Sequence, residues 1–368
     1  MNIGLCGFGV VGRGVYEIVR QRPDMKVKKI LCLEDIQLPD AQTVKDFSEI
    51  LNDPEIDTVV EAMGGLHPSF DFAYAALEAG KNVVSSNKAM VCTFYDELIP
   101  LAMHKGVSLR CTAAVGGGIG WLSELERARR AQTINQVGGI MNGTCNYILD
   151  NMTRLGLGYD EALKQAQKLG YAEANPATDV DGIDTWHKVI LSANVAFGIS
   201  LDKTTVPVSG IRNISAADVD CFKAHGKVCK LISTAKRTED GFSAYVQPTL
   251  VAAGSPEGAV PLNYNLITFI GQTSERMSFY GQGAGRYPTA YNVVQDLVDV
   301  TQGKSFYAPY GAPQAADNQD AHRYYVRGDW EGSIQEDWST GVITTPVPVS
   351  QMHQWLQAHP QAFIAGVD

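Results

Sequence analysis

The sequence has little positive charge and no long apolar run. Lys and Arg total 30 against 40 Asp and Glu, which gives a formal net charge of -10 and a pI of about 5.2. This balance argues against binding nucleic acid or an anionic membrane, because both select basic surfaces. No run approaches the roughly 18 apolar residues of a membrane helix, and the first residues do not resemble a secretory signal. We therefore expect a cytoplasmic protein with neither nucleic-acid nor membrane partners.

Cysteine is present, but in no pattern that carries a known chemistry. The seven cysteines are scattered singly along 368 residues, and no two form a C-x-x-C pair. Zinc sites and thioredoxin-like redox sites usually need such pairs. An odd, dispersed set is also unlike the disulfide framework of a secreted domain. The sequence therefore predicts reduced thiols.

The first third of the chain alternates short apolar runs with helical patterns. The expected strands are 2–6, 27–33, 58–62, 82–85 and 107–112, and the expected helices are 10–19, 70–78 and 94–105. Strands that alternate with helices are typical of parallel β-α-β units. The predicted fold class is α/β, with residues 1–133 forming a Rossmann-type, doubly wound parallel sheet that binds a dinucleotide.

The pattern changes after residue 133. Helical patterns at 159–169 and 183–197 are combined with alternating apolar runs at 242–250 and 266–270. Alternating runs that follow one another are typical of antiparallel strands. Residues 134–284 are therefore predicted to form a second, α+β domain.

The last part of the chain is expected to contain three pieces. Residues 285–302 carry a helical apolar stripe, and we expect this helix to pack back on the first domain. Residues 303–320 are rich in Pro, Gly, Ala and Asn, which is typical of a linker. Residues 321–368 are predicted to form a short C-terminal module that opens with a strand.

The first predicted turn, residues 7–12 (GFGVVG), matches the dinucleotide fingerprint G-x-G-x-x-G. Gly7 permits the tight turn, Gly9 lets the backbone approach a pyrophosphate, and Gly12 lets helix and strand pack closely. Free N–H groups at the following helix N-terminus favour the phosphates. The alternative is a turn without a ligand, but the preceding strand and following helix favour the cofactor loop.

An acidic pair follows the second predicted strand. Glu34 and Asp35 lie about 20 residues beyond the glycine loop, where an acid binds the ribose 2′-hydroxyl of NAD. After Lys29 the next basic residue is Lys45, so we expect no arginine at this strand tip to bind a 2′-phosphate. The pattern favours NAD over NADP, although both acids could be ordinary solvated loop charges.

Residues 170–188 are the most informative segment, because four acids and one lysine stand close together in a lightly charged chain. Asp184 and Lys188 are spaced i, i+4, so they share one face of a helix. That helix continues with apolar residues, which predicts burial. A buried carboxylate and ammonium need each other or a ligand, and a buried lysine can exchange protons. The alternative is a surface ion pair, the commonest outcome of this spacing.

Two further stretches suit a small polar ligand. Lys88 follows the strand 82–85, at the carboxyl edge where open α/β sheets bind ligands. Residues 141–147 form a polar, glycine-containing turn before an apolar helix. Each could also be no more than a capped helix start.

Taken together, these segments resemble the homoserine dehydrogenase family. The resemblance covers about residues 1–302, and the matching segments occur in the order of the family: 7–12, 59–65, 87–89, 113–119, 142–147, 170–188, 283–285 and 288–290. The resemblance implies NAD(P)-dependent interconversion of L-homoserine and L-aspartate 4-semialdehyde, in threonine, methionine and isoleucine biosynthesis. It also implies a homodimer formed through residues 134–284.

The resemblance also implies roles for individual residues. Lys188 would be the general acid/base and Lys88 its electrostatic partner, with the two roles exchangeable, and Asp184 would complete the catalytic group. Glu173, Asp179, Asp184 and Thr144 would bind the substrate, and Asp179 would also orient the lysines. The cofactor would be bordered by Gly7, Phe8, Gly9, Val10, Gly12, Glu34, Gly64, Lys88 and Gly285.

The chain departs from the family in two places. Thr112 stands where the family usually has a glutamate, and Gly120 where it has a proline. That glutamate belongs to a monovalent-cation site, which would here be left with the carbonyls of Val115, Gly117 and Ile119 and would bind sodium less well. Many relatives also carry an ACT domain that senses threonine; residues 321–368 look too short for one, so we expect no threonine inhibition through a normal ACT pair.

Two other classes of protein are alternatives. An aspartate-semialdehyde dehydrogenase would need a cysteine nucleophile, and Cys145, the candidate closest to the site residues, has no histidine beside it in the sequence. A dinucleotide sensor without catalysis would not need to keep Lys88, Lys188 and Asp184. Both alternatives are therefore less favoured than the dehydrogenase.

Overall fold

The computed structural model describes residues 1–239, 241–304 and 311–368 and divides into two compact units. The first unit contains Met1–Arg130, Gly198–Ser200 and Gln282–Ala312. The second contains Ala131–Phe197, Leu201–Gly281 and Pro313–Asp368. Each unit has its own sheet, and the two are described in turn.

The first unit is built on a six-stranded parallel sheet with the order β3-β2-β1-β4-β5-β6. The strands are β1 (Asn2–Cys6), β2 (Lys26–Leu31), β3 (Gln42–Val44), β4 (Thr58–Glu61), β5 (Asn82–Ser85) and β6 (Leu109–Arg110). The chain adds strands on one side of β1 and then on the other. The strand order therefore reverses between β1 and β4, and such a switch point is where open α/β sheets bind ligands at the carboxyl ends of their strands.

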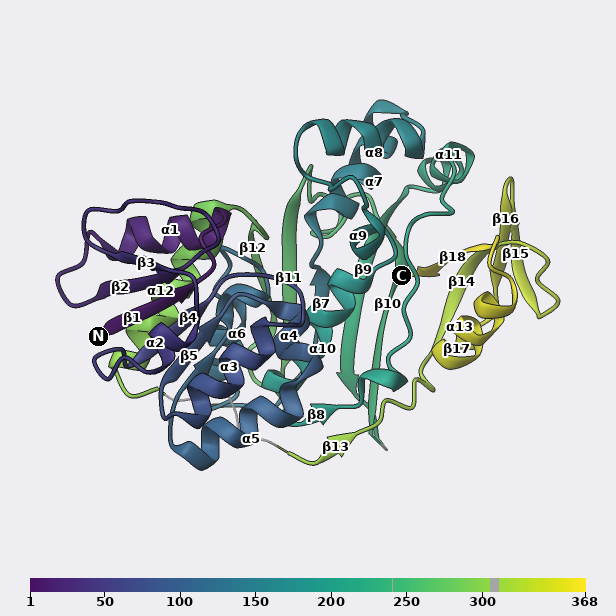
Figure 1. The fold of residues 1–368 in the computed structure, drawn as a ribbon. Helices are drawn as coiled ribbons and strands as arrows, with labels where there is room; N and C mark the ends of the chain where they lie inside the picture. Colours follow the sequence, from purple (N-terminus) through teal and green to yellow (C-terminus); the bar gives the residue numbers. More distant parts are fainter. Residues whose placement is uncertain (240, 305–310) are drawn as a thin grey trace. The chain divides into compact units, whose positions relative to one another are not determined.

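Helices surround this sheet because each carries one apolar face. They are α1 (Val10–Val19), α2 (Ser48–Leu51), α3 (Ser69–Glu78), α4 (Lys88–Thr93), α5 (Tyr95–Lys105), the 3-10 turn η1 (Thr112–Ala114), α6 (Trp121–Ala128) and α12 (Arg286–Thr301). Although α12 comes late in the chain, it packs against α1, as Figure 1 shows. Its Ala290, Val293 and Leu297 share a core with residues of β1 and β2.

The second unit is built on a ten-stranded mixed sheet. Its order is β12-β11-β7-β9-β10-β18-β14-β16-β15, with β17 paired to β14. The strands are β7 (Ile134–Ile140), β9 (Lys227–Arg237), β10 (Phe242–Ala252), β11 (Tyr264–Gly271), β12 (Glu275–Gln282), β14 (Ala321–Arg327), β15 (Ile334–Trp338), β16 (Gly341–Thr344), β17 (Val347–Pro348) and β18 (Phe363–Val367). The described C-terminal residues thus continue this sheet, since β18 pairs with both β10 and β14.

One face of this sheet is covered by helices. α10 (Ile183–Phe197) packs on β7, β9 and β10, and α7 (Gly143–Leu155) packs on β9 and β11 (Figure 1). α10 can lie there because it is apolar on most sides and almost wholly buried. The remaining elements are α8 (Tyr159–Lys168), α9 (Ala177–Val180), α11 (Ala216–Ala224), α13 (Val349–Ala358), the 3-10 turn η2 (Lys203–Thr205) and the paired strands β8 (Ser200–Leu201) and β13 (Pro313–Gln314).

The structure confirms the predicted fold class, including the parallel sheet and a separate mixed α+β sheet. The helices at 10–19 and 183–197 and the strands at 2–6 and 82–85 have the predicted bounds. The strand expected at 107–112 is shorter, because the Thr112 N–H and hydroxyl bind the Asp296 carboxylate instead of a neighbouring strand. The linker predicted at 303–320 lies partly outside the described residues. None of the described helices is long and apolar enough to cross a membrane.

Candidate functional site

The glycine loop connects β1 to α1 with the geometry that a dinucleotide needs. Gly7 has a positive φ of 96°, and a Cβ there would lie 2.7 Å from the Ala62 carbonyl oxygen. A Cβ on Gly12 would lie 2.1 Å from the Gly7 carbonyl oxygen, so only glycine permits this approach of helix to strand. A Cβ on Gly9, at the start of α1, would meet no described atom within 4 Å. The loop therefore fits a pyrophosphate at the helix N-terminus.

The other predicted cofactor residues lie in the same unit. Phe8 is buried, with its ring 5.7 Å from that of Tyr16, whereas Val10 is 65% exposed. Gly64 follows β4, and Gly285 caps the N-terminus of α12. A Cβ on Gly64 would also meet no described atom within 4 Å, so its backbone is open to an approaching ligand.

The expectation that no arginine lies at the carboxyl end of β2 is wrong. An arginine does lie there, because Arg13 of α1 reaches Glu34 with Nη2 3.1 Å from Oε2. The Arg13 guanidinium also lies over the Phe8 ring, 4.7 Å from its centroid. Asp35 pairs with Lys45 at 2.8 Å, and that ammonium lowers the pKa of Asp35. Glu34 and Asp35 are thus each paired with a basic residue from elsewhere in the chain, and the spacing of the sequence did not predict these pairs.

A buried carboxylate that was not among the predicted site residues organises the turn before Lys88. Glu61, at the end of β4, is fully buried, and burial raises its pKa. It accepts hydrogen bonds from the Met63 N–H at 2.9 Å and the Ser85 hydroxyl at 2.6 Å. Ser85 in turn accepts from the N–H of Asn87, the residue that caps α4. Lys88 is the first residue of that helix, so this chain of bonds fixes where its backbone begins.

In the second unit, the turn between β7 and α7 contributes another residue missing from the predicted set. Asn142 caps α7 by accepting from the Cys145 N–H at 2.8 Å. Its amide nitrogen lies 2.7 Å from Asp179 Oδ1 and 2.8 Å from Asp184 Oδ2. One amide therefore joins two carboxylates from α9 and α10. The motif at 141–147 is a helix cap and also part of the polar cluster.

The predicted pair on α10 is buried. Lys188 Nζ lies 2.7 Å from Asp184 Oδ2 and donates to the Met141 carbonyl, also at 2.7 Å. The two side chains are only 9% and 6% exposed. An ammonium in this environment needs these acceptors, since unpaired burial of a charge is costly. The alternative of a solvated surface pair is therefore wrong.

Asp179 and Cys145 complete the surroundings of this pair. Burial, together with the neighbouring charge of Asp184, raises the pKa of Asp179. The Cys145 thiol is fully buried, lies 3.2 Å from the Asp179 carbonyl oxygen, and has its pKa raised by burial. A thiol in this state is a poor nucleophile, which disfavours the aspartate-semialdehyde dehydrogenase alternative.

Two predicted substrate residues lie at the edge of this cluster. Thr144 is buried on α7, and its hydroxyl donates to the Tyr171 carbonyl. Glu173 is exposed on the loop between α8 and α9. The structure thus brings Asp179, Asp184 and Lys188 into one hydrogen-bonded group and leaves Glu173 facing solvent.

Two of the three carbonyls expected to bind a sodium ion already accept hydrogen bonds. The Gly117 carbonyl already accepts from the Asn292 amide at 2.5 Å, and the Ile119 carbonyl accepts from the Trp121 N–H at 2.7 Å. Among residues 1–239, 241–304 and 311–368, no group of three or more His, Cys, Asp or Glu could hold a metal ion.

Comparison with known proteins agrees with this geometry. Residues 7–112 match the sequence model "Homoserine dehydrogenase, NAD binding domain", and residues 121–298 match the model "Homoserine dehydrogenase". The homoserine dehydrogenase of Bacillus subtilis is 34% identical over 84% of this chain and 76% of its own length. The chain belongs to the homoserine dehydrogenase family. The Pseudomonas aeruginosa enzyme is 35% identical over 87% of this chain and 77% of its own.

Solved homoserine dehydrogenases have the same fold. The crystal structure of the Thiobacillus denitrificans enzyme aligns with a TM-score of 0.87 at 28% identity, covering 100% of this chain and 98% of that one. The Staphylococcus aureus enzyme aligns at 0.79 and 27% identity, covering 100% and 99%. The predicted family and activity class are therefore confirmed: the chain is a nicotinamide-dependent oxidoreductase, and the sensor alternative is not favoured.

Proposed function

We propose that the enzyme interconverts L-homoserine and L-aspartate 4-semialdehyde, within threonine, methionine and isoleucine biosynthesis, and that Lys188 moves the proton of the 4-oxygen. One observation carries this proposal. The buried Lys188 amine is held between the Asp184 carboxylate and the Met141 carbonyl, each 2.7 Å away. Two acceptors use two of the three N–H bonds of an ammonium, so the third can face a substrate oxygen.

The proposed chemistry follows from what homoserine oxidation requires. Carbon 4 loses a hydride and its hydroxyl loses a proton; a nicotinamide, when bound, would supply the hydride acceptor, and in its reduced form the hydride donor of the reverse reaction. Lys188, as the neutral amine, accepts the hydroxyl proton, and as the ammonium it protonates the oxygen in the reverse direction. Its positive form also stabilises a developing alkoxide. Lys88 is proposed, by resemblance, as the second positive charge.

The acids around Lys188 are proposed to bind the substrate. Asp184 and Glu173 would accept hydrogen bonds from the homoserine ammonium, and Asp179 would orient the lysine through Asn142, to which it is bonded. Thr144 would hold the Tyr171 segment in place through its bond to the Tyr171 carbonyl. These roles divide substrate binding from proton transfer, so separate substitutions can test them.

The cofactor proposed is NAD, with NADP as the alternative. Glu34 would accept a bond from the ribose 2′-hydroxyl, whereas a 2′-phosphate would have to compete with this carboxylate for Arg13. A hyperthermophilic archaeal homoserine dehydrogenase has been solved with NADPH; it is 22% identical to this chain, so it supports the fold and leaves the choice open. By resemblance we also propose a cytoplasmic homodimer.

Steady-state kinetics with L-homoserine test these roles. Lys188→Ala should lower kcat by about 10²–10⁴, the usual contribution of general acid/base catalysis, with little change in the homoserine KM. Glu173→Gln should mainly raise that KM, since it removes a binding charge. Lys164→Ala, an exposed lysine of α8, is the control and should resemble the native chain. Equal effects of the Lys188 and Lys164 substitutions would refute the proposal.

A further inference from the structure

The segment 115–119 of the first unit lies where a monovalent cation was expected, and an amide already occupies that position. Asn292 of α12 is 2% exposed, and its Nδ2 donates to the Gly117 carbonyl oxygen at 2.5 Å. A cation bound at this oxygen would meet the positively polarised N–H hydrogens of a buried donor and would have to displace the amide. Displacement would leave the amide unsatisfied, which costs free energy in a buried position.

Thr112 stands where the family has the glutamate that binds the cation, and its polar groups are engaged elsewhere. The Thr112 backbone N–H donates to Asp296 Oδ2, and its hydroxyl lies 2.7 Å from Asp296 Oδ1. The hydroxyl also lies 2.8 Å from that of Ser123. Thr112 therefore joins the loop to α12 and offers no charge to an ion.

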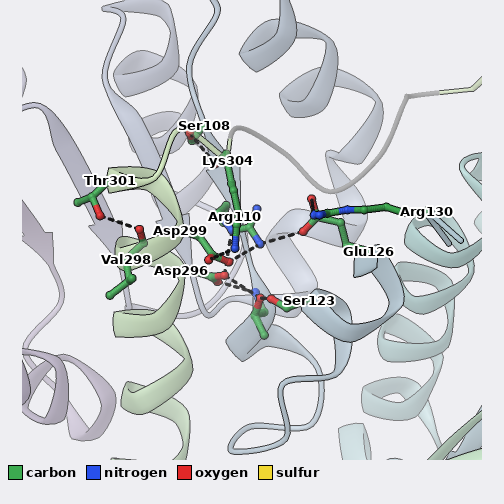
Figure 2. A network of polar contacts seen from close by, with 11 residues as sticks. Ser108, Arg110, Ser123, Glu126, Arg130, Asp296, Val298, Asp299, Thr301 and Lys304 are labelled. Atoms are coloured by element: carbon green, nitrogen blue, oxygen red, sulfur yellow. Dashed lines mark hydrogen bonds and ion pairs between the residues drawn. The ribbon is translucent and has the colours of Figure 1, made fainter. Parts of the chain in front are cut away.

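Positive charge is supplied to this region by the protein itself. Arg110 of β6 is fully buried, with Nε 3.2 Å from Asp296 and Nη2 2.9 Å from Asp299 and 3.1 Å from Glu126. Lys304 reaches Asp299 at 2.6 Å. Figure 2 shows Arg110 among these three carboxylates, two of which come from α12. The carboxylates thus have a fixed internal counter-charge.

We propose that Asn292 takes the place of the monovalent cation and positions the segment 115–119 without any bound ion. The loop it holds is closely packed: a Cβ on Gly117 would lie 2.5 Å from the Gly283 carbonyl carbon, and the Gly118 N–H donates to the Gln282 carbonyl at 3.1 Å. Residues 282–284 lead directly into Gly285, a proposed cofactor contact. Asn292 is therefore a positioning residue that acts on the cofactor through the loop.

The first test compares sodium, potassium and choline chloride at one ionic strength. Thermal unfolding temperature and NAD or NADP binding, followed by fluorescence, should be the same in all three salts, and kcat should change less than twofold. A saturable requirement for sodium or potassium in any of these quantities would overturn the inference. The activity measurement rests on the proposed function, but unfolding and cofactor binding do not, so failure of either claim can be recognised separately.

The second test exchanges the donor for an acceptor. Asn292→Asp has the same shape, but its carboxylate would face the Gly117 carbonyl, so the unfolding temperature should fall and the cofactor KM should rise severalfold in choline. Sodium should restore both, because the variant now offers a carboxylate beside the carbonyls. Gln295→Glu adds the same charge on the exposed side of α12 and should show neither effect. If Asn292→Asp behaves like Gln295→Glu, or sodium does not rescue it, the inference is wrong.

Discussion

Single side chains in this enzyme join segments that are far apart in the sequence. Asn142 caps α7 and also bonds Asp179 and Asp184 from two later helices. Arg13 similarly leaves the first turn of α1 to reach Glu34 beyond β2. Such contacts hold the carboxylates of the candidate site in position, because each fixes a charged atom relative to a helix or strand.

At the same scale, the Arg13–Glu34 pair is expected to set the cofactor choice. Removing the carboxylate in Glu34→Ala releases Arg13 for a 2′-phosphate, so kcat/KM with NADP should rise about tenfold relative to NAD, as one charge-assisted bond allows. The additional Arg13→Ala substitution should abolish that gain. Glu49→Ala, on the exposed side of α2, serves as the control. An unchanged ratio in Glu34→Ala would show that the pair has no role in selection.

At the scale of elements, the ends of neighbouring strands are held together by Glu61. Replacing it with alanine leaves the Met63 N–H and the Ser85 hydroxyl without their acceptor, so unfolding free energy should fall by about 1–3 kcal/mol. Because the same bonds fix the start of α4 and hence Lys88, kcat/KM should fall as well. Denaturant unfolding and steady-state kinetics measure the two effects.

The matched control for that prediction is Glu78→Ala, since Glu78 is an exposed carboxylate at the end of α3 in the same unit. Its pairing with Lys105 at the surface contributes little. If Glu61→Ala and Glu78→Ala had equal effects on stability and activity, Glu61 would have no organising role.

Elements were predictable where local pattern determines them. The helix at 183–197 and the pair Asp184–Lys188 follow from periodicity and i, i+4 spacing. The Met141 carbonyl that completes the lysine's environment could not be predicted, because it depends on how the β7–α7 turn packs against α10. Glu61 was included only as part of the matching segment 59–65. Its organising role could not be predicted, because the local sequence pattern does not show that a single carboxylate is buried.

At the scale of the whole molecule, the C-terminal residues are part of the second unit's sheet. α13 packs on it, with Met352 beside Tyr324 and Ile364 in a buried cluster. His353 of this helix is buried, lies 3.1 Å from Gln247 of β10, and has its pKa lowered by burial to about 4. Sequence alone did not predict this continuation, because the parallel pairing of β10 with β18 is a long-range contact.

Because His353 has a lowered pKa, we expect the free energy of unfolding to depend on pH. Its folded pKa of about 4 lies below the unfolded value of 6.5, so the unfolded state binds the proton first as pH falls. Its contribution is complete above pH 6.5 and is lost between pH 6.5 and 4, by about 3 kcal/mol. His353→Gln, which cannot titrate, should lose correspondingly less stability over this range in denaturant unfolding.

His104→Gln provides the comparison, because His104 is exposed on α5. It should keep the full pH dependence of the native chain. If His353→Gln and His104→Gln followed the same curve between pH 6.5 and 4, burial of His353 would not be the cause.

Oxidation of homoserine by this chain, with Lys188 as the carrier of the proton, can be tested directly. The most direct measurement is the absorbance of reduced nicotinamide after mixing L-homoserine with NAD, and separately with NADP, for the native chain and Lys188→Ala. We expect turnover of the native chain, faster with NAD, and its collapse in the variant while cofactor binding is retained. Absence of turnover with both cofactors in a folded chain that binds them, or full turnover by Lys188→Ala, would contradict it.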